Sequence, residues 1–161
     1  ASERTCQLVT QVAGRSGRGP RGGRVVVQTS TPEHPAIRAA AAHDYEAFVR
    51  SELPIRKALL YPPFGSVIRI VVRSAVDEAA ANWAKHLVER LSKSSQGDES
   101  IRILGPAPAP ISRIRDRYRW HLQIHGPSSE LLRNLVGQSM AGLKTPQEVV
   151  WVVDVDPVEM L

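Results

Sequence analysis

The sequence has one cysteine, few aromatic residues and no long apolar run. The single thiol, Cys6, excludes an internal disulfide and a zinc site made of several cysteines, which favours a reducing compartment, the cytoplasm. Because aromatic residues make up 5% of the chain, a core must consist mainly of Leu, Val, Ile and Ala. No apolar run approaches the roughly 18 residues of a membrane-spanning helix, and the first residues lack a signal-peptide pattern. We therefore expect no membrane partner.

The chain is basic, and its charge is unevenly distributed. Of 161 residues, 21 are Lys or Arg and 16 are Asp or Glu, giving a net charge of +5. Residues 1–60 hold nine basic and five acidic side chains, whereas residues 61–161 hold twelve and eleven. Such a balance favours anionic partners, nucleic acid or nucleotide first. With 42% hydrophobic residues, the composition is that of a folded protein rather than a disordered one.

Two breaks in composition divide the chain. One is the Gly- and Arg-rich stretch 14–23, and the other is the Pro-containing stretch 61–65, which stops any helix that precedes it. We therefore expect one unit at 1–60 and another at 61–161. Apolar periodicity in the first unit predicts a helix at 4–13, a short buried strand at 24–30, and helices at 35–42 and 43–60.

The second unit has a more regular pattern. It predicts strands at 66–73, 101–104, 118–125 and 149–155, and helices at 77–93 and 128–143, with a Pro-rich link at 105–110. Asp77 and Ser128 are the expected N-caps of the two helices. The order β-α-β-β-α-β indicates an α+β fold of the ferredoxin-like kind, an antiparallel sheet with two helices on one face. Trp120 is expected in the core of this unit, and His121 and His125 on its surface.

The string QVAGRSGR at 11–18 holds the first candidate site. At helical spacing, one side of the string presents Gln11, Arg15 and Arg18. The opposite, buried side would consist of Val9, Val12 and Ala13. Guanidinium groups suit phosphate oxygens and can offset the charge that develops during phosphoryl transfer, while Gly14 and Gly17 would let the backbone approach a nucleotide. A flexible basic tail is the alternative, since Gly/Arg stretches are often that.

A second candidate is a row of arginines that recur at every second position. In an extended chain all of them point to one side, where they could follow a phosphate backbone; they are Arg113, Arg115, Arg117 and Arg119. The alternative is that the arginines form only the solvated face of an ordinary strand. A turn near Arg115 and Asp116 would also point the arginines before and after it in different directions.

The string at 11–18 also matches the Q-x-x-G-R-x-G-R pattern that closes the second motor lobe of superfamily 2 helicases. Further strings follow in a fixed order, among them QT at 28–29, PEHP at 32–35, YPPF at 61–64, LGPAPAPI at 104–111, RYRW at 117–120 and DVDP at 154–157. Together they make the whole chain resemble the PriA family of bacterial replication-restart helicases, also called primosomal protein N′.

This resemblance implies a C-terminal fragment of an ATP-dependent 3′→5′ DNA helicase that assembles primosomes at stalled forks. Residues 1–60 would close the second RecA-like lobe, and residues 61–161 would bind DNA. Gln11, Arg15 and Arg18 would face ATP, with Gly14 and Gly17 shaping the turn. The expected partners are single-stranded and forked DNA, other primosome proteins, and single-stranded-DNA-binding protein, whose acidic tail Arg133 could meet.

The sequence lacks a G-x-x-x-x-G-K-[ST] phosphate loop, a D-E-x-H box and the family's zinc-binding cysteine cluster. The resemblance therefore implies that ATP and Mg²⁺ bind only to the full-length protein, that zinc belongs to an upstream region, and that this chain alone does not hydrolyse ATP. Two alternatives remain open at this point. One is a non-enzymatic RNA-binding or ribosome-associated module with a basic tail, and the other is a docking domain whose arginines serve solubility.

Overall fold

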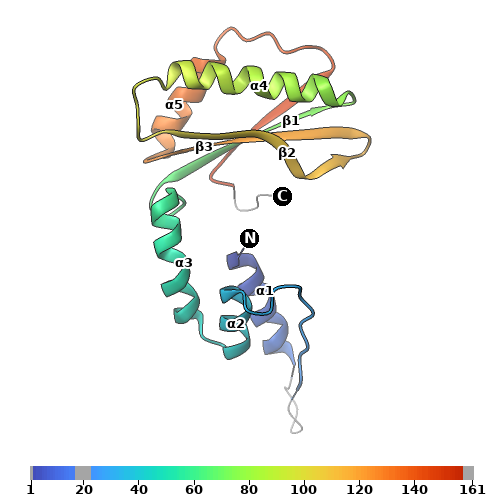
Figure 1. The fold of residues 1–161 in the computed structure, drawn as a ribbon, viewed down its shortest axis with the longest axis vertical. Helices are drawn as coiled ribbons and strands as arrows, with labels where there is room; N and C mark the ends of the chain where they lie inside the picture. Colours follow the sequence, from blue (N-terminus) through green and yellow to red (C-terminus); the bar gives the residue numbers. More distant parts are fainter. Residues whose placement is uncertain (1, 17–22, 158–161) are drawn as a thin grey trace. The chain divides into compact units, whose positions relative to one another are not determined.

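The computed structural model describes residues 2–16 and 23–157. The chain divides into two compact units, Ala1–Ile55 and Arg56–Leu161. Figure 1 shows helices alone in the first unit and a sheet with two helices in the second. Each unit has a hydrophobic core of its own, so each is described separately.

The first unit consists of α1 (Ser2–Arg15), α2 (Pro35–Ala42) and most of α3 (Tyr45–Leu59). Helix α2 begins with Pro35, and the Ala36 backbone N–H donates to Nδ1 of His34 at 3.2 Å. The helices meet through a small core, to which Val9 and Val49 add partly buried contacts; its buried members are Cys6, Ala36, Ala39, Ala40 and Phe48.

Two expectations for the first unit are wrong. Residues 24–30 form no strand, and Val26 is 79% exposed. A strand needs a neighbour for its backbone hydrogen bonds, and residues 2–16 and 23–55 contain no other strand. Val12 is also exposed rather than buried, because α1 packs against its neighbours through Cys6 and Val9, which lie earlier in the helix.

The second unit contains a four-stranded antiparallel sheet in the order β2-β3-β1-β4. Its elements are β1 (Ser66–Ser74), α4 (Asp77–Ser94), β2 (Arg102–Ile114), β3 (Arg117–Gly126), α5 (Ser129–Met140) and β4 (Val149–Val155). Both helices lie on the same face of the sheet (Figure 1). The strand order and the antiparallel pairing confirm the ferredoxin-like arrangement.

The main core lies between the sheet and the two helices. Alternate residues of β1 and β3 point into it, where they meet the apolar stripes of the helices. The strands supply Ile68, Ile70, Val72, Leu122 and Ile124, and the helices supply Ala80, Ala84, Leu87, Leu91, Leu132, Leu135 and Val136. Trp120 packs against this core, as expected. The odd-numbered residues of both strands therefore face the other way, onto what we call the second face of the sheet.

Two elements differ from their predicted form. Strand β2 continues to Ile114 through the stretch expected to be a link, with irregular pairing between Leu104 and Arg113. Prolines are tolerated there because β2 lies at the edge of the sheet, where backbone N–H groups need no partner strand. The second difference concerns the start of α4. Its N-cap is Val76, which forms no side-chain cap, whereas Ser128 caps α5 as expected, accepting from the Leu131 N–H at 3.3 Å.

Candidate nucleic-acid interface

The four arginines of the predicted row lie on a hairpin rather than on one strand. Strand β2 ends at Ile114, β3 begins at Arg117, and the two residues between them, Arg115 and Asp116, have φ angles of 50° and 58°. Two positive φ angles make a tight turn of the kind that suits the twist of a hairpin. The expected single row is therefore wrong, because the turn reverses the chain in its middle.

The hairpin also divides the arginines between the two faces of the sheet. Arg113 is paired with Tyr118, so it lies on the opposite face from Arg117, which pairs with Ile114. Its guanidinium lies 5.0 Å from the centre of the Tyr118 ring, and its Nη2 donates to Oδ1 of Asp116 at 3.1 Å. These contacts hold Arg113 in place. Arg115 and Arg117 are exposed at the end of the hairpin.

Three further arginines gather on the second face. Arg73 of β1 is directly opposite Arg119 of β3. Arg69 lies four residues before Arg73 on the same face of β1, opposite Gln123. We call Arg69, Arg73 and Arg119 the second-face arginines. Arg69 and Arg119 are buried, with 8% and 7% exposure, whereas Arg73 is exposed.

The second-face arginines interact electrostatically with one another and with His121. Burial lowers the pKa of Arg119, and the positive charges of Arg73 and Arg69 lower it further. Burial also lowers the pKa of His121, with added effects of Arg69 and Arg119. Nη1 of Arg119 donates to the Ile111 carbonyl at 3.1 Å.

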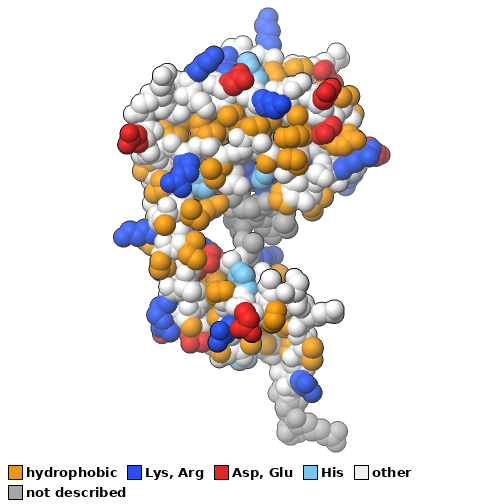
Figure 2. All heavy atoms as spheres, viewed as in Figure 1, with side chains coloured by type: hydrophobic (Ala, Val, Ile, Leu, Met, Phe, Trp, Pro, Cys, Tyr) orange, Lys and Arg blue, Asp and Glu red, His pale blue; other side chains and the backbone are white. Residues whose placement is uncertain are grey.

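The carboxylate of Asp154 lies 3.9 Å from Nη2 of Arg69. Arg69 and Arg119 also make further contacts. Positive charge thus concentrates on the two central strands, although residues 61–161 carry almost balanced charge. On the side of the second unit that Figure 2 shows, basic, acidic and apolar side chains are interspersed.

His125 does not lie on the surface, as the sequence suggested, but is 1% exposed. Its Nδ1 is 3.3 Å from the Leu59 carbonyl at the end of α3, and its Nε2 is 3.1 Å from Oε1 of Gln123. The Tyr61 ring packs edge-on at 4.8 Å between ring centres. Burial lowers the pKa of His125, opposed by the hydrogen bond to Leu59. His125 therefore contacts the last residues of α3 from strand β3. The sequence pattern could not reveal this contact, because the two segments lie far apart along the chain.

The nucleotide-facing candidates lie partly within the described residues. Gln11, Gly14 and Arg15 are exposed on α1, and Gln11 and Arg15 are one helical turn apart. Gly17 and Arg18 lie outside the described residues. A side chain at Gly14 would meet nothing within 4 Å, so the fold of the described residues does not require a glycine at this position.

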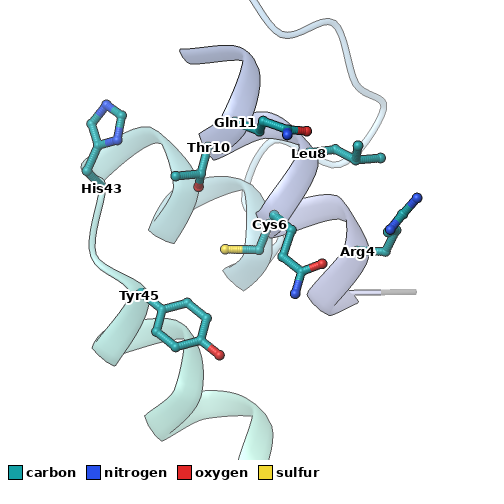
Figure 3. A pocket seen from close by; sticks show the side chains of 8 residues that line it. Arg4, Cys6, Leu8, Thr10, Gln11, His43 and Tyr45 are labelled. Atoms are coloured by element: carbon teal, nitrogen blue, oxygen red, sulfur yellow. The ribbon is translucent and has the colours of Figure 1, made fainter. Parts of the chain in front are cut away.

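A hollow of about 730 Å³ lies beside α1. Gln11 lines it together with residues of α1 and with His43 and Tyr45. Figure 3 shows Cys6 pointing from α1 toward the neighbouring helix, whereas Arg4 and Leu8 point away from it. The hollow is thus bordered both by α1 and by the junction between α2 and α3, where His43 and Tyr45 lie.

The remaining candidate, Arg133, is exposed on α5. Its Nε donates to the Ser129 carbonyl at 3.2 Å, and its Nη2 lies 3.4 Å from the Ser129 hydroxyl. The described residues contain no group of three or more His, Cys, Asp or Glu side chains that could hold a metal ion. None of the helices in this part of the chain combines the length and apolarity that a membrane span requires.

Comparison with known proteins gives a consistent result. The family model for the primosomal protein N C-terminal domain matches residues 57–158. The chain is 37% identical to the replication restart protein PriA of Synechocystis sp. over 99% of its own length and 19% of that protein. The replication restart protein PriA of Haemophilus influenzae is 35% identical, and the match covers 99% of this chain and 22% of that protein. The PriA of Bacillus subtilis is 34% identical, and the match covers 100% of this chain and 20% of that protein. The chain thus spans about a fifth of the length of these relatives.

Proposed function

The chain belongs to the family of the primosomal protein N C-terminal domain, and we propose that it is the C-terminal part of a DNA helicase that acts in replication restart. The observation that carries this proposal is the match to replication restart proteins along nearly the whole chain, which includes the first unit as well as the second. The ferredoxin-like fold by itself supports many functions, so the proposal rests on this match together with the arginines on the surface.

In this proposal the second unit contacts single-stranded and forked DNA. Arg115 and Arg117 are the main hairpin contacts, because both are exposed at its end. Arg113 is held by Asp116 and Tyr118, so it supports the hairpin and contributes less to DNA. Guanidinium groups contact phosphate oxygens without reading sequence, which suits a protein that acts at forks of any sequence.

The first unit has a second role in the proposal. Gln11 and Arg15, together with Gly14, Gly17 and Arg18, face ATP bound by the full-length helicase with Mg²⁺, and the chain alone does not hydrolyse ATP. Gly14 supports this role, because a glycine inside a helix costs about 1 kcal/mol relative to alanine and the open space around it leaves room for a closely approaching ligand or domain.

The proposed partners are single-stranded-DNA-binding protein and other primosome proteins. Arg133 is the candidate contact for the acidic tail of the former. It is exposed, and its bonds to Ser129 lie within its own helix, so the guanidinium can turn toward a partner. Titration of the chain with an acidic tail peptide, compared with Arg133→Ala, tests this contact, and unchanged affinity would remove the residue from the surface.

The DNA contact is tested by fluorescence anisotropy with single-stranded and forked DNA at a series of salt concentrations. The variant Arg115→Glu/Arg117→Glu is compared with Lys85→Glu/Lys93→Glu, which makes the same change of charge on exposed positions of α4. We expect the hairpin variant to lower the salt slope of log K by about 1.4, since each phosphate contact on single strands contributes about 0.7. No binding by the wild-type chain at low salt would contradict the DNA-binding role. Equal effects of the two variants would contradict its placement on the hairpin.

The ATP-facing role is tested in the full-length protein. We expect Arg15→Ala to reduce DNA-stimulated ATP hydrolysis strongly while nucleotide binding is largely kept, because an arginine near the γ-phosphate acts mainly on the developing charge. Turnover equal to that of the wild type would contradict the assignment. Arg38→Ala, another exposed arginine of the first unit, is the matched control.

A further inference from the structure

The last turn of α3 leaves one backbone carbonyl to be satisfied from outside the helix. The Tyr61 N–H donates to the Arg56 carbonyl at 2.9 Å, and Leu60 between them has a φ angle of 55°. This is the pattern of a Schellman motif, in which glycine is the usual residue of positive φ, so a leucine makes the turn strained. The Leu59 carbonyl takes no part in the motif and lies 3.3 Å from Nδ1 of His125.

His125 meets this turn from the sheet. Its side chain is buried on the second face, away from the main core. Because a carbonyl only accepts, Nδ1 must carry the proton that it donates to Leu59. Nε2 lies 3.1 Å from Oε1 of Gln123, and the Tyr61 hydroxyl donates to the same oxygen at 3.4 Å. A side-chain amide suits either protonation state of Nε2, because it offers an oxygen on one side and an NH₂ group on the other. We call Leu59, Tyr61, Gln123 and His125 the α3 latch.

We infer that the α3 latch has two states, closed around a neutral His125 and open when His125 is protonated, while the sheet stays folded in both. None of the four latch residues belongs to the main core, so the turn can open without disturbing it. The Leu59 side chain is exposed and adds little apolar burial, and the strain at Leu60 opposes closure. Because the boundary between the two units falls within α3, opening would free the end of the segment that joins them.

The elements packed against His125 carry mainly positive charge. These charged side chains are Arg102, its partner on β2, and Arg56 and Lys57 on the last turn of α3. On the β1 side the partner is Val67, whose N–H donates to the Asp156 carboxylate at 2.9 Å. A second positive charge at the latch is therefore disfavoured.

The response to pH follows from the two states. Burial lowers the pKa of His125 in the closed state, the hydrogen bond to Leu59 partly offsets this, and the charge of Arg102 lowers it further. In the open state the ring meets water, where a histidine has a pKa of about 6.5. Protons therefore bind the open state first, and acid favours opening. Between pH 7.5 and 5.5 the open population should rise about tenfold.

The test is hydrogen exchange of the whole chain, followed by NMR and corrected for the intrinsic rate at each pH. The Tyr61 N–H reports the latch, and the Ile70 N–H in the central strand β1 reports the sheet. At pH 7.5 the Tyr61 N–H should be less protected than the Ile70 N–H, and low concentrations of urea should not change its protection, as expected for local opening. At pH 5.5 its protection should fall about tenfold.

Three variants assign the response to His125. His125→Ala should lower the protection of the Tyr61 N–H about tenfold at pH 7.5 and remove its pH dependence. Gln123→Glu places a carboxylate beside Nε2, which favours the charged ring, so acid should no longer open the latch. This variant decides the question even where His125→Ala does not fold. His121→Ala is the control, because the pKa of His121 is also lowered by burial, and it should keep the tenfold change.

The outcomes that would overturn the latch differ from one another. Equal protection and equal urea dependence of the Tyr61 and Ile70 N–H groups would show that the turn opens only when the sheet unfolds. Protection of the Tyr61 N–H that is unchanged at pH 5.5 would exclude a switch in this pH range. A wild-type pH response in Gln123→Glu, or its loss in His121→Ala, would show that the charge of His125 does not control the turn.

Discussion

The contact between Trp120 and Asp77 offers a sharp test of how β3 is joined to α4. Nε1 of Trp120 donates to Oδ1 of Asp77 at 2.8 Å. Asp77 is the first residue of α4, where its carboxylate also meets the positive end of the helix dipole. The perturbations are Asp77→Ala, which removes both effects, and Trp120→Phe, which removes only the hydrogen bond and part of the ring.

The expected magnitude follows from the two contributions. A hydrogen bond to a charged group contributes about 1.5–3 kcal/mol, and the lower end applies here because the pair is exposed to solvent. The carboxylate in the first turn adds about 0.3–1 kcal/mol. Asp77→Ala should therefore lower the free energy of unfolding by about 2 kcal/mol. At about 4 °C per kcal/mol for a domain of this size, the melting temperature should fall by about 8 °C.

The assay is urea unfolding of the two single variants and the double variant, followed by circular dichroism. The double-mutant cycle isolates the hydrogen bond from the dipole effect, and we expect a coupling free energy of about 1.5 kcal/mol, the contribution assigned to the hydrogen bond above. A coupling below about 0.3 kcal/mol, within the error of additivity, would refute the reasoning. Asp77→Asn keeps an acceptor oxygen without the charge and should lie between the wild type and Asp77→Ala.

Two further predictions concern the stability of the second unit. Gly137→Ala should raise the free energy of unfolding by about 0.5–1 kcal/mol, because a side chain at this position in α5 would meet nothing within 4 Å. Gly65→Ala should lower the free energy of unfolding, because its Cβ would lie 2.7 Å from the Leu60 carbonyl oxygen. Urea unfolding measures both changes, and effects of the same sign would contradict these two expectations. Burial lowers the pKa of His125 and of His121, so below about pH 6.5 the unfolded chain takes up protons before the folded one and stability should fall. Unfolding midpoints measured from about pH 7.5 to 5 check this, and His125→Gln should flatten the decline, while a stability that rises on acidification would rule the explanation out.

The secondary structure of the second unit could be predicted because its patterns are local. The alternation in β1 and β3 and the apolar stripes of α4 and α5 each depend on a few neighbouring residues. The errors arose where the outcome depends on a neighbour that the pattern does not reveal. Residues 24–30 have the composition of a strand but no partner strand within the described residues of their unit, and β2 runs through prolines because it lies at an edge.

The candidate site was harder to predict for two reasons. The turn at Arg115 and Asp116 has neither the Asn nor the Gly that usually marks two residues of positive φ, so the arginines around it read as one row. The position of His125 depends on contact with the end of α3, far away in the sequence. The sequence therefore offered the turn only as an alternative to a continuous row, and the position of His125 is not visible in a window of neighbouring residues.

The second-face arginines show why strand register matters more than net charge in this fold. Arg73 and Arg119 belong to different strands, and only the antiparallel pairing of β1 with β3 brings them together. A register shifted by one residue would place Arg119 on the helix side, in the apolar core, so the buried residues that fix the register also fix the arginines. The same apolar residues that stabilise the sheet, Ile68, Ile70 and Leu122, therefore set the positions of the charges on its other face. A substitution in the core that loosened this pairing would therefore shift these arginines relative to one another without changing any of them.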